Sequence, residues 1–298
     1  MDRGCIGIVT VTYNSGDVLL AFLTCVFAQT HANFLLFAVD NASVDNTIEI
    51  LASCSDERLT VIANPDNRGI AEGDNQGILR ALDADCSSIL LLNNDTEFDA
   101  TLLEQLASGL KAYECDMVCP KMLYFDQPHR IWAAGGLFQP RLGYRTLHYG
   151  EGQVDRGQFD EARAVTFAPA CCILVRSELF AKIGLMDPRY FVYSDDADFL
   201  YRALEVGAKL YYMPDVRLLH KVSSLTGGEN SPFTIRYTTR NRAYFKLKHL
   251  GRFTAWFWNG LYRVYYLAKF LAFKASFAEL QMRQRAISEA YTMPRDDL

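Results

Sequence analysis

The sequence contains little that would point away from an ordinary globular protein. Across its 298 residues there is no internal repeat and no low-complexity segment, and 50% of the residues are hydrophobic while 22% are charged. A chain of this composition can bury a sizeable core, which excludes a disordered protein and leaves room for one large domain plus a modest extension. The first residues contain no basic stretch followed by an apolar run, as a secretory signal would, so we expect a cytoplasmic protein.

Metal-binding cysteine patterns are also missing. The chain has eight cysteines, but no two of them form a CxxC pair. Cys115 and Cys119 are four residues apart, Cys171 and Cys172 are adjacent, and neither pair has the second half that a zinc site needs. We therefore predict that the cysteines are buried, reduced thiols.

Acidic residues are scarce in one part of the chain. The net charge is −5, yet residues 236–285 carry 11 Lys and Arg residues against Glu279 alone, whereas residues 1–235 carry 18 against 31 Asp and Glu residues. This asymmetry separates an acidic body from a basic and aromatic tail. We divide the chain into a main domain, residues 1–225, and a C-terminal helical extension, residues 226–298.

The tail also lacks an uninterrupted apolar run. Residues 253–273 are rich in Trp, Tyr and Phe but contain polar and charged side chains, so we expect no helix that spans a bilayer. At helical spacing the polar side chains form one stripe: Lys248, Arg252, Asn259, Arg263 and Lys274. The apolar side chains lie off it: Trp256, Phe257, Leu261, Val264 and Leu271. This pattern fits either contact of residues 245–275 with an anionic membrane surface or packing on the main domain.

Strands and helices alternate over the first hundred residues. Apolar and β-branched runs predict strands at residues 6–13, 34–39, 59–63 and 89–92, and periodic apolar stretches predict helices at 18–27 and 47–52. The last of these strands is apolar throughout, so we place it centrally in a mostly parallel sheet. The alternation predicts an α/β, doubly wound fold, in which ligands bind beyond the carboxyl ends of the strands.

The pattern is weaker in the second half of the main domain. Residues 130–165 are rich in Gly, Arg and Tyr and predict a long loop or small hairpins over the site. Residues 172–175 predict a strand that leads into a helix. A further strand at 209–213 is followed by a predicted turn at Pro214-Asp215 and then by His220.

Polar clusters follow three of the predicted strands, at Tyr13-Asn14, Asp40-Asn41 and Asn93-Asn94-Asp95. Asp40 can accept a hydrogen bond from a pyrimidine N–H or a ribose hydroxyl, although a residue here could equally cap the next helix, through Ser43 or Asp45. Asp95 and the preceding amides suit a hard divalent cation whose other ligands are diphosphate oxygens and water. The alternative for this cluster is an Asx turn.

Residues 67–77 combine spaced glycines with polar side chains at the start of a helix. Gly69 and Gly73 allow a close approach of the backbone, and Asn67 or Asn75 can hydrogen-bond a ligand. Spaced glycines alone are a weak signal of a binding site.

Three carboxylates fall within four residues, at Asp195, Asp196 and Asp198, ahead of an apolar helical run. Acidic residues stabilise a helix N-terminus, but three exceed what capping needs. Crowded carboxylates raise one another's pKa, which suits a general base that works near neutral pH. His220 by itself is more often a structural residue than a metal ligand.

Together these residues resemble the family 2 glycosyltransferases of the GT-A fold, especially the bacterial rhamnosyl- and galactofuranosyltransferase-like members. The matching motifs, in chain order, are Thr12-Tyr13-Asn14, Asp40 to Asp45, Asn67 to Gly77, Asn93-Asn94-Asp95 as a degenerate DxD motif, Gly184 to Asp187, Phe191 to Phe199, and the triplet Arg240-Asn241-Arg242. The order and spacing of these motifs is far more specific than any one of them.

The resemblance implies a role for each candidate residue. Asp196 would be the catalytic base with Asp195 beside it, and Asp95 and His220 would hold Mn²⁺ or Mg²⁺. The nucleotide sugar would be bound by Thr12, Tyr13, Asn14, Asp40, Asn41, Asn67, Gly69, Asn75, Asn94 and Arg240. Two positions depart from the family pattern, because Asp95 is the single acid of the metal motif and Asp195 replaces the usual Glu.

The resemblance also implies a reaction. Residues of about 1–100 would bind the nucleotide, and residues of about 101–225 the acceptor. The sugar of dTDP-rhamnose, or next a UDP-hexose, would pass with inversion to a hydroxyl of a cell-surface glycan or lipid-linked precursor, at the inner face of the cell membrane. We expect no nucleic-acid partner.

Two other functions remain compatible with an α/β core. A sugar nucleotidyltransferase usually begins with a glycine- and arginine-rich phosphate loop, which residues 9–14 do not contain. A non-catalytic nucleotide-binding module would need neither the acidic cluster nor His220.

Overall fold

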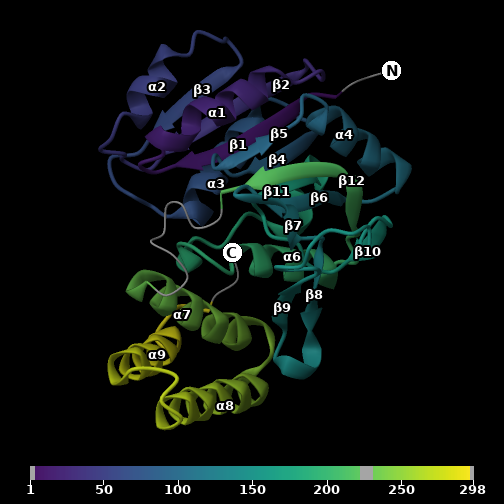
Figure 1. Ribbon diagram of the computed structural model, residues 1–298. Coiled ribbons are helices and arrows are strands. Elements are labelled where there is room, and N and C mark those ends of the chain that lie inside the picture. Colours follow the sequence, from purple (N-terminus) through teal and green to yellow (C-terminus); the bar gives the residue numbers. More distant parts are fainter. Residues whose placement is uncertain (1–3, 222–230, 296–298) are drawn as a thin grey trace.

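A large sheet forms the centre of the protein, which the computed structural model describes over residues 4–221 and 231–295 (Figure 1). Its strands lie in the order β10-β12-β6-β11-β4-β1-β2-β3, with β5 paired to β12 and β7 to β6. The bounds are β1 (Ile6–Thr12), β2 (Phe34–Asp40), β3 (Leu59–Ala63), β4 (Ser88–Leu92), β5 (Thr96–Phe98), β6 (Met117–Tyr124), β7 (Gln127–Ala133), β10 (Arg163–Val165), β11 (Cys172–Arg176) and β12 (Leu210–His220). A separate hairpin pairs β8 (Gly136–Gln139) with β9 (Arg145–His148).

Helices cover the sheet and continue beyond it. Those of the main domain are α1 (Gly16–Phe27), α2 (Thr47–Ser53), α3 (Ile70–Asp83), α4 (Leu102–Ala112), α5 (Ser177–Ile183) and α6 (Asp195–Glu205), with the 3₁₀ turns η1 (Pro140–Leu142) and η2 (Pro188–Tyr190). After them come α7 (Pro232–His249), α8 (Arg252–Leu271) and α9 (Phe277–Ala290).

The direction of the strands agrees with the mostly parallel sheet that the sequence predicts. β1 pairs in parallel with β2 and β4, β2 pairs in parallel with β3, and β12 pairs in parallel with β6. The fully buried β4 lies between β1 and β11, which confirms its predicted central place. β11 runs antiparallel to both β4 and β6, a reversal that no periodicity in the sequence indicates.

The strand order changes direction next to β1. The chain passes from β1 to β2 and β3 on one side, and then crosses to β4 on the other side. Because such crossovers are right-handed, α3 must lie on the opposite face from α1 and α2, as Figure 1 shows. The carboxyl ends of β1 and β4 therefore border a switch point, where ligands bind in doubly wound sheets.

Glycines bring α3 close to β1. A Cβ atom on Gly73 would lie 2.8 Å from the side chain of Val11, and one on Gly77 would lie 2.3 Å from that of Val9. The spaced glycines of residues 67–77 thus serve helix–sheet packing, in addition to any approach to a ligand.

β12 corrects the prediction of a turn at Pro214-Asp215. The strand continues through both residues, and the register with β6 shifts between Met213 and Arg217. Proline cannot donate to a sheet ladder, so a bulge accommodates it without ending the strand. The longer strand carries His220 to the far end of the sheet, where it pairs with Thr96 of β5.

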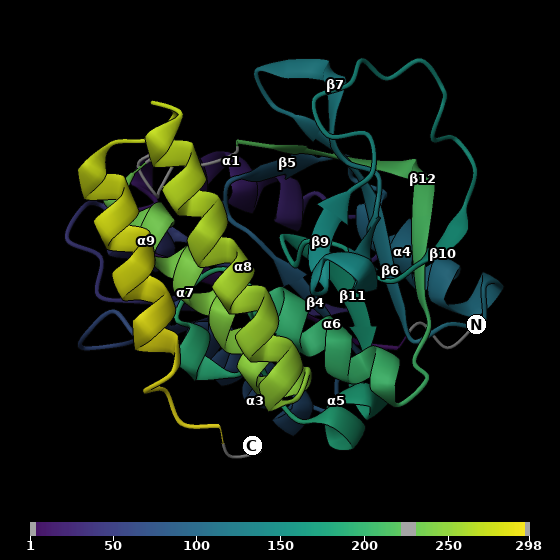
Figure 2. The ribbon, with the colours of Figure 1, turned by 90° about the horizontal axis from the view of Figure 1, so that it is seen from below.

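The C-terminal helices pack against the sheet domain and one another (Figures 1 and 2). Ala243, Tyr244, Phe245 and Leu247 of α7 belong to the same buried core as the central strands. The boundary expected at residue 225 falls after the end of β12 and before the start of α7. The buried core nevertheless includes residues from both sides of this boundary.

The middle of the polar stripe on α8 faces the protein. Asn259 is buried and donates to the carbonyl of Ala243, and Arg263 donates to Gln284 of α9, whereas Arg252 and Lys274 are exposed. The apolar side chains Phe253, Trp256, Phe257, Leu261, Val264, Leu267 and Leu271 are exposed. In the part of the chain that the structure describes, no helix is both long enough and apolar enough to span a bilayer.

Candidate functional site

The carboxyl end of β2 places Asp40 beside the end of β1. Asp40 Oδ1 accepts from Thr12 Oγ1 at 2.8 Å and from Ser43 Oγ at 2.5 Å, and Oδ2 accepts from the Ser43 N–H at 2.9 Å. The carboxylate is buried, yet two oxygens can accept about four hydrogen bonds. It therefore keeps capacity for a donor on a ligand while Thr12 and Ser43 hold its orientation.

The loop after β1 is held by the loop after β2. Asn14 has a positive φ of 51°, donates its N–H to Ser43 Oγ at 2.8 Å and accepts from the Val44 N–H at 2.8 Å. Asp45, one of the two capping candidates, accepts from the N–H groups of Thr47 and Gly16 and so joins the starts of α2 and α1. This bracing leaves the ring of Tyr13 exposed at the edge of the crevice.

The amides expected to bind the nucleotide sugar near α3 are largely used within the protein. Asn75 donates to the carbonyl of Met186 at 2.9 Å and accepts from its N–H at 2.8 Å, which ties α3 to the segment before η2. Asn41 donates to the carbonyl of Gly69 at 3.0 Å, and Asn67 accepts from the Gly69 N–H. These residues shape the loop that begins α3, where Gly69 has a φ of +83°.

Asp95 and His220 meet because β5 pairs with the end of β12. Asp95 Oδ1 lies 3.2 Å from His220 Nε2, and the ring of His220 packs against Trp132 with centroids 4.4 Å apart. Among residues 4–221 and 231–295, His220 Nδ1 and Asn94 Oδ1 are buried and find no hydrogen-bond partner, while the Asn94 amide donates to the carbonyl of Val11 at 2.6 Å. Buried polar atoms left in this way are the usual mark of a missing ion, water or ligand.

These groups fit a divalent cation in part. A carboxylate and an imidazole side by side are suitable ligands for Mn²⁺, and orphaned acceptors stand next to them. Within residues 4–221 and 231–295, no group of three or more His, Cys, Asp or Glu side chains gathers as a ready-made metal site. A cation held here would take its remaining ligands from a bound diphosphate and water.

The acidic cluster divides into two environments at the start of α6. Asp195 is buried and Asp196 is partly exposed, and burial raises the pKa of both carboxyls, with the charge of Asp196 adding to the rise at Asp195. The Asp196 carboxylate accepts from the N–H of Ala197 at 2.7 Å, which offsets part of the rise. An exposed carboxylate with a raised pKa is suited to accept a proton.

Asp198 has a structural role that its place in the cluster does not reveal. It is 0% exposed, and its oxygens accept from Lys248 Nζ at 2.7 Å, Arg202 Nε at 2.9 Å and the Tyr190 hydroxyl at 3.2 Å, with His249 Nε2 at 2.7 Å. This network fixes α6 to the end of α7.

The loop before α6 is strained. Phe191, Tyr193 and Ser194 all have φ values between 65° and 66°, which residues other than glycine rarely adopt. Asn241 of α7 holds the loop, because its amide donates to the carbonyls of Tyr190, Val192 and Tyr193 at 2.7 to 2.8 Å. Asn241, a buried side chain of the C-terminal segment, thus helps to set the orientation of α6, which bears Asp195 and Asp196.

Arg240, expected at the nucleotide sugar, instead contacts this same loop. Its guanidinium donates to the carbonyls of Arg189 and Tyr190 at 3.0 and 2.9 Å and to Asn241 Oδ1 at 2.8 Å. The side chain is buried and stacks 4.6 Å from the Tyr237 ring. Its hydrogen bonds give it a positioning role.

Cys171, the residue just before β11, lies near acids of both groups described above, Asp95 and Asp196. The thiol of Cys171 is buried, and burial first, then the charges of Cys172, Asp95 and Asp196, raise its pKa. The carbonyl of Cys171 accepts from the Asn93 N–H at 2.9 Å. Asp95 and Asp196, a hundred residues apart in sequence, therefore both lie near Cys171.

One acidic residue of the site is absent from the sequence-based set. Asp74 of α3 is buried, and burial together with the charge of Asp195 raises the pKa of its carboxyl. Its sequence signal was an acid within the polar, glycine-spaced start of α3, but periodicity cannot show that this position lies near Asp195. For the same reason the motif that contains Asn241 did not reveal its contacts with the loop before α6.

The fold is an α/β sheet domain with buried acidic residues where the strand order changes direction. The chain belongs to glycosyltransferase family 2: residues 7–184, more than half of its length, match the description "Glycosyl transferase family 2". It is therefore a glycosyltransferase, as the motifs predict.

Two similar proteins transfer rhamnose. A dTDP-rhamnosyl transferase of Shigella flexneri is 24% identical over 242 residues, which cover 78% of this chain and 77% of that protein. An N-acetylglucosaminyl-diphospho-decaprenol L-rhamnosyltransferase of Mycobacterium tuberculosis is 23% identical over 266 residues, 82% of this chain and 85% of that protein.

Solved structures share the fold at low identity. GalNAc-T7 with UDP, GalNAc and Mn²⁺ superposes with a TM-score of 0.68 at 14% identity, over 96% of this chain and 55% of that one. Residues 1–349 of TarS from S. aureus with UDP superpose with a TM-score of 0.61 at 16% identity, over 96% and 80%. The GT-A fold predicted from the motifs is thereby confirmed.

Proposed function

We propose that this glycosyltransferase moves a sugar from a nucleoside diphosphate to an acceptor hydroxyl with inversion of configuration. The observation that carries the proposal is that Asp196 and Asp95 both lie close enough to Cys171 for their charges to act on its thiol, at the carboxyl end of β4. One crevice then offers a proton acceptor and a place for a diphosphate. A base and a leaving-group site on opposite sides of one sugar suit a single displacement.

The proton is taken by Asp196. The acceptor oxygen forms its bond to the anomeric carbon while the Asp196 carboxylate accepts the hydroxyl proton, and the bond from that carbon to the diphosphate oxygen breaks. Burial raises the pKa of the Asp196 carboxyl to about 6, which favours proton uptake near neutral pH.

Asp95 and His220 would hold Mn²⁺ or Mg²⁺. When bound there, the cation supplies positive charge to the departing diphosphate. The solved structure of GalNAc-T7 with UDP and Mn²⁺ supports this proposal, as do the orphaned acceptors at Asn94 and His220. Asp40, Thr12 and Tyr13 would bind the nucleoside.

The donor nucleotide and the metal can be tested together by thermal unfolding with UDP, dTDP or GDP, each with and without Mn²⁺. A ligand at 100 times its Kd stabilises a protein by about 2.7 kcal/mol. We expect dTDP to give the largest increase in Tm, UDP the next, and Mn²⁺ to add to either. Asp95→Asn and His220→Gln should lose the increment from Mn²⁺ and keep the metal-free response. An unchanged increment in both variants would remove these residues as metal ligands.

The reaction itself is tested by the product it releases. With a nucleotide sugar and an acceptor, a glycosyltransferase releases a nucleoside diphosphate, whereas a nucleotidyltransferase releases pyrophosphate and a binding module releases neither. The rhamnosyltransferase relatives favour dTDP-rhamnose as donor and a lipid-linked saccharide or cell-envelope glycan as acceptor. Release of pyrophosphate would contradict the proposal.

The protein would work at the inner surface of the cell membrane, with α8 as the contact. Apolar side chains line its outer face, with Trp256 70% and Phe253 91% exposed, and Arg252 and Lys274 are exposed at its two ends. An apolar face flanked by cations is suited to the interface of an anionic bilayer. The inward-facing polar stripe leaves this apolar face free.

Vesicle binding tests this contact. We expect the protein to sediment with vesicles that contain anionic lipid, and the double variant Trp256→Ser and Phe257→Ser to bind more than roughly tenfold less, because each buried aromatic contributes about 1.5–3 kcal/mol. The control is Leu20→Ser, since Leu20 is an equally exposed apolar residue on α1. Equal binding of the double variant and the control would exclude α8 as the contact.

A further inference from the structure

A basic pocket lies beside the start of α6, on the side of Asp195 and Asp196 that faces the C-terminal helices. Its walls come from four elements that are far apart in the sequence: the β8–β9 hairpin, α6, α7 and α8. The lining residues that matter here are Arg145, Ser194, Ala197, Arg242, Lys246 and Tyr262. Because Ser194 and Ala197 flank the two carboxylates, a ligand in this pocket lies next to the proposed base.

The pocket concentrates positive charge. Arg145, Arg242 and Lys246 all line it, and no carboxylate of residues 4–221 or 231–295 forms an ion pair with any of the three. Elsewhere in the protein, buried cations such as Lys121 and Lys248 each have carboxylate partners. The three cations of the basic pocket are therefore available to an anion from outside the chain.

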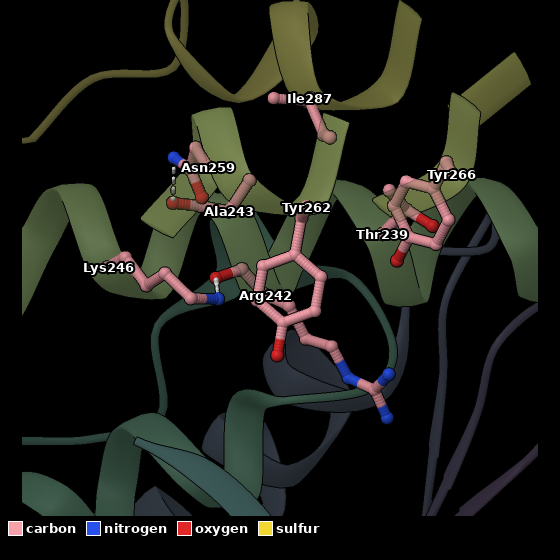
Figure 3. A pocket seen from close by; sticks show the side chains of 8 residues that line it. All are labelled: Thr239, Arg242, Ala243, Lys246, Asn259, Tyr262, Tyr266 and Ile287. Atoms are coloured by element: carbon pink, nitrogen blue, oxygen red, sulfur yellow. Dashed lines mark hydrogen bonds between the residues drawn. The ribbon is translucent and has the colours of Figure 1, made fainter. Parts of the chain in front are cut away.

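Without a ligand, the surroundings of Lys246 disfavour the charged form of its amine. Its side chain is buried, and Nζ donates to the carbonyl of Arg242 at 2.7 Å and lies 4.8 Å from the centre of the Tyr262 ring (Figure 3). Burial and the charge of Arg242 lower the pKa of Lys246 to about 7. An anion bound between them would remove this repulsion and favour the charged amine.

A diphosphate matches these groups better than a single charge does. Two guanidinium groups offer paired donors to phosphate oxygens, and the ammonium group adds a third positive charge. The place proposed for the donor's diphosphate is beside Asp95 and His220, neither of which lines this pocket. The basic pocket is bounded instead by Tyr262 of α8, the helix whose outer face exposes apolar side chains.

We infer that the basic pocket binds the diphosphate of a lipid-linked acceptor, so that the acceptor sugar lies over Asp196 and the lipid runs toward the apolar face of α8. This inference rests on the proposed transfer reaction for the identity of the acceptor sugar. It assigns Arg145, Arg242 and Lys246 to the acceptor.

A comparison of farnesyl diphosphate with farnesol distinguishes binding of the diphosphate from binding of the lipid chain, because both compounds have the same chain and only the first has the diphosphate. Binding is measured by calorimetry in the presence of Mn²⁺ and saturating UDP or dTDP, which keeps the donor site filled. We expect the wild-type protein to bind farnesyl diphosphate at least roughly tenfold more tightly than farnesol, and Arg145→Gln and Arg242→Gln each to weaken diphosphate binding by about tenfold, as expected for a charge-assisted hydrogen bond.

Arg141→Gln is the matched control, because Arg141 is an exposed arginine of the same hairpin that does not line the pocket. It should bind both compounds like the wild type. Arg145 and Arg242 are also exposed, so neither substitution removes core packing.

Three results would overturn the inference: equal affinity for farnesol and farnesyl diphosphate, an equal loss in Arg141→Gln, or a loss of UDP or dTDP affinity in the pocket variants, which would assign the pocket to the donor. Failure of the proposed function looks different. In that case no nucleoside diphosphate is released with any acceptor, while arginine-dependent binding of farnesyl diphosphate persists and supports the pocket.

Discussion

Replacing Asp196 with asparagine is expected to lower kcat by at least about 100-fold, the range in which general base catalysis contributes. Asparagine keeps the size and polarity of the side chain but cannot accept the acceptor proton. The affinity for the nucleotide should stay unchanged, because the residues proposed to bind it, Thr12 and Asp40, lie on β1 and β2, whereas Asp196 lies on α6. Release of nucleoside diphosphate measures the turnover, and the thermal response to nucleotide measures binding.

Asp195→Asn is the matched comparison for this experiment. Asp195 is buried whereas Asp196 is partly exposed, so an acceptor hydroxyl reaches Asp196 more readily, and the activity should fall much less than in Asp196→Asn. Turnover that survives in Asp196→Asn and disappears in Asp195→Asn would make Asp195 the base.

The pH profile follows from the same geometry. Burial raises the pKa of Asp196, and a base acts only when deprotonated, so kcat/KM should fall on acidification at a higher pH than an ordinary aspartate would give. The acidic limb should be absent from the residual activity of Asp196→Asn.

Replacing Asp198 with alanine is expected to destabilise the fold by about 3–5 kcal/mol. The substitution removes the carboxylate partner of Arg202, one of the two carboxylate partners of Lys248 and the contact with His249, at a position where the carboxylate is 0% exposed. Urea unfolding measures the change. The control is Asp66→Ala, which removes an exposed ion pair with Arg68 and should cost less than about 1 kcal/mol. A similar small loss at both positions would contradict the role given to the buried network.

Acid should destabilise the wild type through the same carboxylate. Despite burial, which acts to raise it, the pKa of Asp198 is held well below its usual range by the His249 hydrogen bond and the charges of Arg202 and Lys248. Its stabilisation is therefore present above the ordinary aspartate pKa of the unfolded chain and is lost as the pH falls toward the lower folded value. Asp198→Ala should show a flatter dependence of stability on pH in this acidic range.

The positions of strand-end residues could be predicted because they depend on local pattern. The apolar run at β4 has no solvated face, and this alone placed it centrally. Asp40 and Asp95 follow such strands, so a shared crevice at the carboxyl ends followed from parallel pairing. The run of motifs was equally local, and the match of the family to residues 7–184 confirms the class of enzyme that it indicated.

Contacts between distant segments could not be predicted in this way. Asp195, Asp196 and Asp198 look alike in sequence, yet Asp198 is drawn into α7 by Lys248 and His249. Arg240 was expected at the nucleotide, but it contacts carbonyls of the loop before α6. In each case the deciding contact is with a residue about fifty positions away in the sequence.

α8 also shows the difference between local pattern, which could be predicted, and contacts between distant segments, which could not. Its periodicity determined that polar and apolar side chains lie on different faces, but a helix has no intrinsic preference for which face meets its neighbours. Hydrogen bonds from Asn259 and Arg263 turn the polar face inward.

By itself, then, the sequence determined the α/β fold, the family and the ends of the strands at which the candidate residues lie, because these depend on periodicity and on residue types at fixed spacing. Only the tertiary structure decided which acids face the crevice, which side of α8 is exposed and where the unpaired cations gather, because burial and charge pairing arise between segments that the chain brings together on folding.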